Sequence, residues 1–336
     1  MSPATAREPL TPEAQAARTG PGVLRRNAAP LLAAFGAFCI TFALLLRFFL
    51  YSQIAMIPAD MRMELRLTDE AATYLDTSTW KTVKDTEVVR SIGVTGTTSP
   101  GNPGWSAWDM STDTATKEHM IEHMDRRVIV DRSTGTAVNC CGEHVDGDRA
   151  VRQAGLVLSW PANATDDEYA FYDADIRAAP RMVFDGTEDI GGTATRRFVQ
   201  RISPTQVPQS SREVPAAALG LDRDGTVDAT RWVEVERTYW IEPVSGNVVN
   251  AAEKRTETLR SESGRGERVL LDADLTLQDT QVSAYTENAR STRLLLIAVR
   301  TYLPIVLGAV GTVLLAAGLL AAARARRGPR HDLTGQ

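Results

Sequence analysis

Two long apolar segments lie near the two ends of the chain. The first runs from Asn27 to Leu46 and the second from Thr301 to Ala323, and neither contains a charged residue. A helix needs roughly 20 apolar residues to cross a bilayer core of about 30 Å, so both segments are long enough. The pattern predicts one transmembrane helix at residues 28–51 and a second at residues 294–323, which begins with a membrane-proximal part.

Two other interpretations of these segments fit less well. A buried core helix of a soluble protein is rarely this long without a charge. A cleaved signal peptide is disfavoured because 26 residues precede the first segment and no small-x-small site follows Tyr51. We therefore expect an uncleaved membrane anchor at each end.

The 242 residues between the spans alternate apolar and polar positions, which is typical of strands with one buried face. Met63, Leu65 and Leu67 alternate with polar residues, and Val269 to Leu277 repeats the pattern. The predicted fold class is α+β and membrane-anchored, with two transmembrane helices flanking a β-rich, mostly antiparallel domain. The expected strands are Met61–Asp69, Thr86–Thr95, Arg126–Asp131, Gly155–Trp160, Arg181–Asp185, Thr195–Ser203, Trp232–Glu242, Asn247–Leu259 and Glu267–Thr280.

Two further segments complete the predicted organisation. Pro204–Ala229 is rich in Pro, Ser and Ala and is expected to be a long loop or lid, whereas Val282–Arg293 lacks helix breakers and should extend the second helix. The predicted domains are a cytoplasmic tail (1–27), the first span (28–51), an extracytoplasmic domain (52–293), the second span with its membrane-proximal part (294–323) and a basic cytoplasmic tail (324–336).

Charge predicts the orientation and excludes one class of partner. Basic residues lie against the outer end of each span, at Arg25 and Arg26 and at Arg324, Arg326 and Arg327, which is typical of cytoplasmic flanks. We therefore expect a two-pass plasma-membrane protein with both termini in the cytoplasm. The domain at 52–293 holds 27 Lys and Arg against 39 Asp and Glu, which argues against nucleic-acid binding because phosphates demand a basic surface.

Three cysteines give little information about the fold. Cys39 lies in the first span, which leaves the adjacent pair Cys140 and Cys141 in the domain. Neighbouring cysteines can form an eight-membered disulfide ring, remain reduced or bridge to another chain, and the sequence leaves these open.

The sharpest catalytic pattern is His119-Met-Ile-Glu122-His123, which matches the H-x-x-E-H motif of some zinc hydrolases. Zinc binding by this motif requires a helix, which places both histidines one turn apart. Here the flanking residues predict turns and a strand, and on a strand the histidines would stand about 13 Å apart. We expect solvated polar residues and keep the zinc hydrolase as an alternative.

Other motifs are weaker. Asp222–Asp228 resembles a calcium loop, but Gly225 is misplaced and a charged turn fits better. Asn163-Ala-Thr165 is a glycosylation sequon by pattern alone. Tryptophans and tyrosines of the strand-like segments could line a groove for an acyl chain or a sugar, although core packing is the commoner role. We therefore expect a non-enzymatic protein with no catalytic, cofactor-binding or metal-binding residues and no cofactor.

Several blocks of the chain carry a resemblance to a known family. The blocks are Met61–Leu67, Val130–Gly135, Cys140-Cys141, Gly155–Pro161, Tyr169–Asp173, Tyr239–Pro243 with Gly246, and Asn288–Arg290 before the span that contains Pro304. Taken in order, they resemble a family of actinobacterial envelope proteins, a domain of unknown function often labelled the porin PorA family. The resemblance implies a two-pass envelope protein with an extracytoplasmic β-rich domain, and it implies no catalytic residues.

The expected function is assistance in cell-envelope assembly, by binding a lipid, a lipoglycan precursor or a partner enzyme. Membrane lipids are expected partners, and glycines at 308, 311 and 318 have spacing that suits helix–helix contact or oligomers. The alternative is a channel or porin-like transport component, as the label implies. A β-barrel porin spans with many strands of about 10 residues, whereas this chain offers two apolar helices with almost no polar lining.

Overall fold

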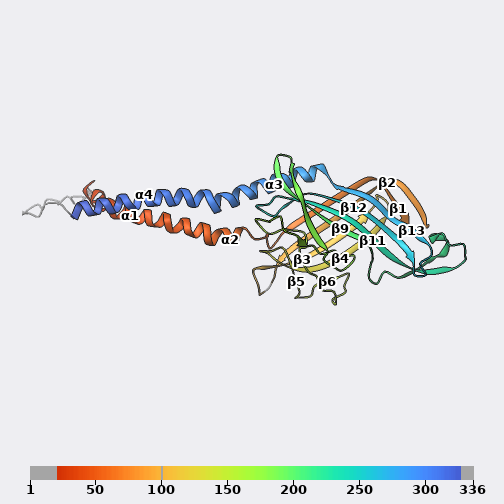
Figure 1. Ribbon diagram of the computed structural model, residues 1–336. Coiled ribbons are helices and arrows are strands. Elements are labelled where there is room, and N and C mark those ends of the chain that lie inside the picture. The colour runs from red at the N-terminus through yellow and green to blue at the C-terminus, as the bar shows by residue number, and fades with distance from the viewer. Residues whose placement is uncertain (1–20, 100, 327–336) are drawn as a thin grey trace, which may run out of the picture. The chain divides into compact units, whose positions relative to one another are not determined.

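The computed structural model describes residues 21–99 and 101–326 and separates the chain into two compact units (Figure 1). One unit contains the two terminal helical segments, up to Arg47 and from Thr301 onward, and the other is formed by Phe48–Arg300. The boundary of the β-rich unit therefore lies a few residues outside the predicted domain at 52–293. The predicted α+β class is confirmed.

The helical unit consists of α1 (Pro21–Leu45) and α4 (Leu303–Arg326), which pack against each other through small residues. A Cβ atom added at Gly36 would lie 2.5 Å from the Leu315 nitrogen, and one at Gly318 would lie 2.6 Å from the Ala33 nitrogen. These backbones approach so closely because neither glycine carries a side chain. Within the described residues, the helices Ala28–Ile54 and Asp279–Arg326 are long and apolar enough to cross a membrane.

The helices do not start and stop where the sequence predicted. The first begins at Pro21 and continues through η1 (Leu46–Leu50) into α2 (Tyr51–Ile54). As predicted, the second begins well before its apolar part, with α3 (Asp279–Ile297), η3 (Ala298–Tyr302) and then α4. Residues 1–20 and 327–336 of the two predicted tails lie outside the described residues.

The β-rich unit is built on one antiparallel sheet with the order β5-β4-β3-β2-β1-β13-β12-β11-β9-β8-β7 (Figure 1). Two short strands lie off this path, because β6 pairs with β4 and β10 pairs with β11. The strands are β1 (Arg62–Asp76), β2 (Lys81–Thr98), β3 (Trp105–Ala115), β4 (Met120–Asp131), β5 (Ala137–Val138), β6 (His144–Val145), β7 (Tyr169–Ala170), β8 (Arg181–Ile190), β9 (Thr193–Gln206), β10 (Arg212–Pro215), β11 (Thr226–Ile241), β12 (Val248–Ser261) and β13 (Glu267–Leu277).

The sheet curls until its two ends meet at Leu156. This residue forms an antiparallel bridge to Thr136, next to β5, and a parallel bridge to Phe171, next to β7. Its amide nitrogen donates to the Ala170 oxygen at 2.7 Å, and its oxygen accepts from the Tyr172 nitrogen at 2.9 Å. The curled sheet therefore encloses an interior, which alternate residues of each strand face.

Apolar and aromatic side chains fill much of that interior. The rings of Trp160, Phe171, Phe198 and Tyr239 lie with their centroids 5.4–5.8 Å apart in a continuous cluster. Such pairs add attraction to that of burial alone. These four aromatic residues are therefore core residues, the commoner of the two predicted roles.

Helix α3 packs on the sheet through polar contacts at its start. Gln281 Oε1 accepts from the Arg66 amide at 2.9 Å, and its Nε2 donates to the Glu64 oxygen at 2.8 Å. The Tyr285 hydroxyl donates to the same oxygen at 2.6 Å. These bonds explain why the helix begins next to β1 directly after the chain leaves β13.

Bulges change the direction of side chains at two places. A register shift between Glu257 and Thr258 on β12 places Leu270 of β13 inside and leaves Val269 exposed, so the predicted inward position of Val269 is wrong. In β8, the register shifts between Phe184 and Thr187, where Gly186 has a φ of +104°. Only glycine adopts such a φ without strain.

Three predicted segments differ from the structure. Asp109–Thr116, before His119, was expected to form turns, but it lies almost entirely in β3. Gly155–Trp160 is not a strand, because Leu156 only bridges the sheet ends and the chain then crosses the interior. Pro204–Ala229 is not one long loop. It contains the end of β9, β10, the 3₁₀ helix η2 (Ala216–Leu219) and the start of β11. Val214 and Leu219 are buried there, so small hydrophobic residues in a Pro-rich segment form a second core.

Candidate functional site

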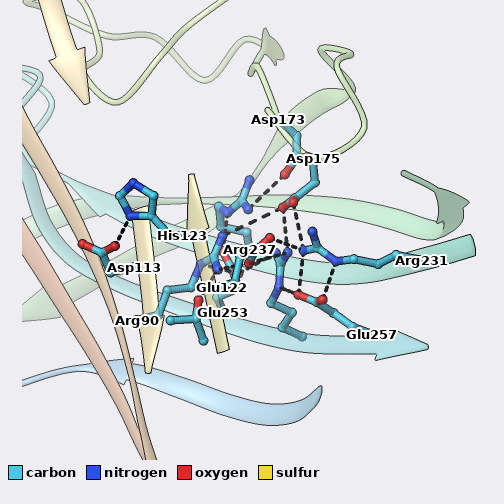
Figure 2. Close-up of polar contacts among 12 residues, drawn as sticks. Arg90, Asp113, Glu122, His123, Asp173, Asp175, Arg231, Arg237, Glu253 and Glu257 are labelled. Carbon is cyan, nitrogen blue, oxygen red and sulfur yellow. Dashed lines mark hydrogen bonds and ion pairs between the residues drawn. The ribbon is translucent and has the colours of Figure 1, made fainter. Parts of the chain in front are cut away.

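Nine charged side chains meet on the inner face of the curled sheet (Figure 2). We call this set the ion network. Four members are guanidinium groups and five are carboxyl groups, and each contact between them measures 3.9 Å or less. They are Arg90, Arg231, Arg237, Arg255, Glu122, Asp173, Asp175, Glu253 and Glu257.

Arg255 lies at the centre of the ion network and is fully buried. Its Nη2 donates to Asp175 at 2.6 Å, its Nη1 to Glu253 at 3.2 Å, and its Nε to Glu257. Each of these carboxylates also contacts a second arginine. Removing one partner from a buried network leaves an uncompensated charge, so the contacts depend on one another.

The second half of the ion network tethers a loop to the sheet. Arg237 Nη2 donates to Asp173 at 3.1 Å, and its Nε donates to Glu253 at 2.6 Å. Arg231 Nη2 lies 3.0 Å from Asp175. Both aspartates follow β7, whereas the arginines lie on β11, so the network fixes residues 173–175 over the interior.

A sequence signal for the ion network exists, and the predictions missed it. Glu253, Arg255 and Glu257 alternate on β12 between buried Ala251 and Leu259, so they occupy the inward positions of a two-residue repeat. Charges at every second position of a strand whose ends are apolar indicate buried ion pairs. The contribution of Asp173 and Asp175 could not be read in this way, because they lie outside regular strands.

Within the ion network, the pKa values of Glu253 and Asp175 are lowered, whereas that of Glu122 is raised. Burial alone raises the pKa of Glu253, but the attraction of Arg237, Arg90 and Arg255 outweighs it and lowers the pKa to about 2. The pKa of Asp175 is likewise lowered well below its usual value, because Arg255, Arg231 and Arg90 outweigh the effect of burial. Both groups are therefore ionised at neutral pH.

Glu122 differs from the other carboxyl groups. Burial and repulsion by Asp175 and Glu257 raise its pKa, and the attraction of Arg231 and Arg255 only partly opposes this. Five carboxyl groups share four guanidinium groups, so one carboxyl lacks a full counter-charge. Glu122 is the most accessible of those that share Arg231, with 13% of its side chain exposed. Its ionised form is therefore the least stabilised of the carboxylates that share Arg231.

Glu122 and Arg231 also line an open cleft of about 350 Å³. Its other polar walls include Ser78, His119, Ser210 and Arg212. Within residues 21–99 and 101–326, Arg212 has no carboxylate partner, and burial together with repulsion by Arg231 lowers the pKa of its guanidinium. The cleft thus places an unpaired cation beside the exposed end of the ion network.

The three H-x-x-E-H residues do not converge on one point. His119 directly precedes β4 and lines the cleft with Glu122, whereas Glu122 and His123 are successive residues of β4 and point to opposite faces of the sheet. Glu122 joins the ion network inside, whereas His123 is 52% exposed and lies 2.5 Å from Asp113 and 3.1 Å from Asp125 (Figure 2). The prediction of solvated residues is therefore wrong for Glu122. No metal-binding group of three or more His, Cys, Asp or Glu occurs among the described residues.

The remaining candidates have structural roles. Cys140 and Cys141 form a disulfide with each other, which decides between the three alternatives. The side chain of Asn163 in the sequon donates to the Tyr51 hydroxyl at 2.6 Å and accepts from Arg300 at 2.5 Å. Residues 222–225 form an exposed turn before β11, as predicted for a charged turn.

Comparison with known proteins agrees with the resemblance seen in the sequence. The family model described as Porin PorA matches residues 28–320. A protein named Porin PorA from Corynebacterium resistens is 21% identical over 293 residues, which cover 66% of this chain and 71% of the relative. The match spans both apolar helices and the whole curled sheet, and the chain therefore belongs to the Porin PorA family.

Proposed function

We propose that the protein is a non-enzymatic component of the cell envelope, whose β-rich unit binds an anionic polar group of a lipid, a glycolipid or a partner enzyme. The observation that carries the proposal is the cleft in which Arg212, without a carboxylate partner among the described residues, lies beside Arg231. Guanidinium groups suit carboxylates and phosphates because their N–H groups form paired hydrogen bonds.

Size and polarity support a headgroup rather than an acyl chain as the occupant of the cleft. Ser78, Ser210 and His119 add polar groups to the walls, whereas Trp160, Phe171 and Phe198 of the aromatic core do not line the cleft. Ligand sites of about 300 to 1,000 Å³ are common in proteins, so a volume of about 350 Å³ suits a compact headgroup.

The test is native mass spectrometry with lipid analysis on the full chain, purified in a mild detergent from an actinobacterial host. We expect a co-purifying anionic lipid or glycolipid, and we expect Arg212→Met to reduce its occupancy at least fivefold. Arg181→Met is the matched control, because Arg181 is exposed outside the cleft and pairs with Glu168 at 2.8 Å. Equal occupancy in both variants would refute the cleft as the site.

The membrane arrangement is part of the proposal. Two helices able to cross a membrane and basic residues next to their outer ends support a two-pass plasma-membrane protein with both termini in the cytoplasm. Single cysteines placed at Ser2 and Thr334, in a chain with Cys39 replaced by serine, should resist a membrane-impermeant maleimide in intact spheroplasts. Labelling of either position would contradict this orientation.

A channel is the second candidate, and the names of the family and of the Corynebacterium resistens relative favour it. Conduction through the curled sheet would require a passage past the aromatic cluster and the ion network, so a pore would have to be formed by assembled helices. Reconstitution of the full chain in planar bilayers provides the test. Stepwise conductance that scales with protein concentration would favour the channel over the headgroup-binding proposal.

The proposal of a non-enzymatic role rests on the opposite directions of Glu122 and His123. A zinc hydrolase would need these side chains on one metal ion. Elemental analysis of the full chain purified without chelators checks this point. Stoichiometric zinc that is lost in His119→Ala and His123→Ala would overturn the proposal.

A further inference from the structure

A second cavity, of about 50 Å³, lies inside the curled sheet and is distinct from the cleft. It is bounded by inward residues of β2, β3 and β4 and by the segment 171–175. Three guanidinium groups line it, those of Arg90, Arg126 and Arg237, against the carboxylates of Asp173 and Asp175. The walls of this cavity therefore carry more positive than negative charge.

Arg126 is the wall residue without an ion-pair partner among residues 21–99 and 101–326. Its Nε and Nη2 atoms are buried and receive no hydrogen-bond partner from these residues. The guanidinium carbon lies 5.4 Å from the ring centroid of Tyr172, whose buried hydroxyl likewise has no partner in the described part of the chain. Burial lowers the pKa of Arg126 to about 10, so the group remains charged at neutral pH.

The neighbouring carboxylates are already engaged elsewhere. Asp173 pairs with Arg237 at 3.1 Å, and Asp175 pairs with Arg255 at 2.6 Å. Glu143, whose charge contributes to the raised pKa of Tyr172, pairs with Arg152 at 3.0 Å. A buried cation with unused donors is costly unless a counter-charge is supplied.

We propose that this cavity binds one small monovalent anion of the size of chloride or bromide, held by Arg126 Nε and Nη2 and by the Tyr172 hydroxyl. A cavity needs about 10–15 Å³ to hold one water, so about 50 Å³ admits a halide together with one or two waters. Phosphate esters and lipid headgroups are too large. The proposal does not depend on the occupant of the cleft.

The test compares the thermal unfolding of the full chain in sodium chloride, sodium bromide and sodium gluconate at equal ionic strength. An anion that binds only the folded state raises the Tm, and for a unit of this size we expect about 2–4 °C once chloride exceeds its Kd several-fold. Crystals grown in sodium bromide should show an anomalous peak beside Arg126. A water molecule in its place would overturn the proposal.

Two variants and a control make the result specific. Arg126→Met should abolish the chloride response, whereas Arg127→Met should keep it, because Arg127 is on the same strand but pairs outside with Asp109 at 2.8 Å. Tyr172→Phe removes only the hydroxyl and should raise the Kd for chloride several-fold, so it serves if the Arg126 variant does not fold. An equal response in all these chains, or none in the wild type, would refute the site.

Discussion

The inner and outer faces of the curled sheet both carry arginine–carboxylate pairs, but the two faces use them differently. Inside, Arg255 is fully buried and each of its partners is shared with another arginine. Outside, Arg201 pairs with Glu236 alone at 2.8 Å, with 65% of the arginine side chain exposed. Water screens the outer pair and is excluded from the inner one, so the same chemical pair has different consequences on the two faces.

The largest expected effect tests this difference directly. Arg255→Met leaves the buried Asp175, Glu253 and Glu257 short of counter-charge, and we expect the free energy of unfolding to fall by about 3–5 kcal/mol. Urea denaturation of the full chain, followed by tryptophan fluorescence, measures it. The matched outer variant is Arg201→Met, for which we expect less than about 1 kcal/mol. Similar losses in the two variants would contradict the comparison.

The second-largest expected effect is a loss of folding stability in acid, caused by carboxylates of the inner face. The pKa of Glu253 is about 2 in the folded chain and about 4.5 in the unfolded chain, so its contribution is present above the unfolded value and is lost as pH falls toward 2. This group alone should cost roughly 3 kcal/mol over that range. Urea midpoints measured between pH 7 and pH 3 check the loss, and Glu253→Gln should flatten the curve. An unchanged slope in the variant would argue against the lowered pKa.

The pKa of Glu122 is raised, whereas that of its neighbour Glu257 is lowered, so the two replacements should differ in their effect on stability. A raised pKa means that its stabilising contribution is present below the unfolded value and is lost as pH rises through the folded value. Glu122→Gln removes a charge that burial and the neighbouring carboxylates already disfavour, so we expect a loss below about 1 kcal/mol at pH 7. Glu257→Gln removes a charge that is paired with Arg231 and Arg255 and should cost about 1.5–3 kcal/mol. The reverse order would contradict the raised pKa of Glu122.

The smallest effect concerns His123, which lies on the outer face of β4. Hydrogen bonds to Asp113 and then to Asp125 raise the pKa of His123, so that its contribution is present below the unfolded pKa and is lost as pH rises through the folded pKa. NMR titration of the imidazole measures the shift. Asp113→Asn should return the pKa toward its ordinary value more strongly than Asp125→Asn, while overall stability stays nearly constant. A large stability change would show that the outer pairs are not screened.

Much of the architecture could be predicted because periodicity reports local burial. Two apolar helices, the strand character of most segments and the helical extension before the second span all follow from the spacing of apolar residues. Gly155–Trp160 misled the prediction, since its residues are as buried as those of a strand but cross the interior instead. Burial alone does not distinguish these two conformations.

The candidate site was less predictable than the fold. The alternation of Glu253, Arg255 and Glu257 was visible, but an isolated strand sequence does not show which residues neutralise it. Asp175 is 80 residues from Arg255 along the chain, and only the closed sheet brings them together. Arg212 was likewise hidden in a segment predicted to be a loop, because its neighbours have turn composition.

The bulge at Gly186 has a consequence for how the molecule meets its neighbours. Beyond its short pairing with β7, β8 leaves the backbone groups of residues 183–190 without a strand partner on one side among the described residues. An exposed edge of this kind is a template for strand addition by another chain. The bulge bends the edge, and the charged side chains of Asp185, Glu188 and Asp189 lie along it, which disfavours the pairing of two such edges. Aggregation through this edge is thereby discouraged in a protein that is concentrated in two dimensions.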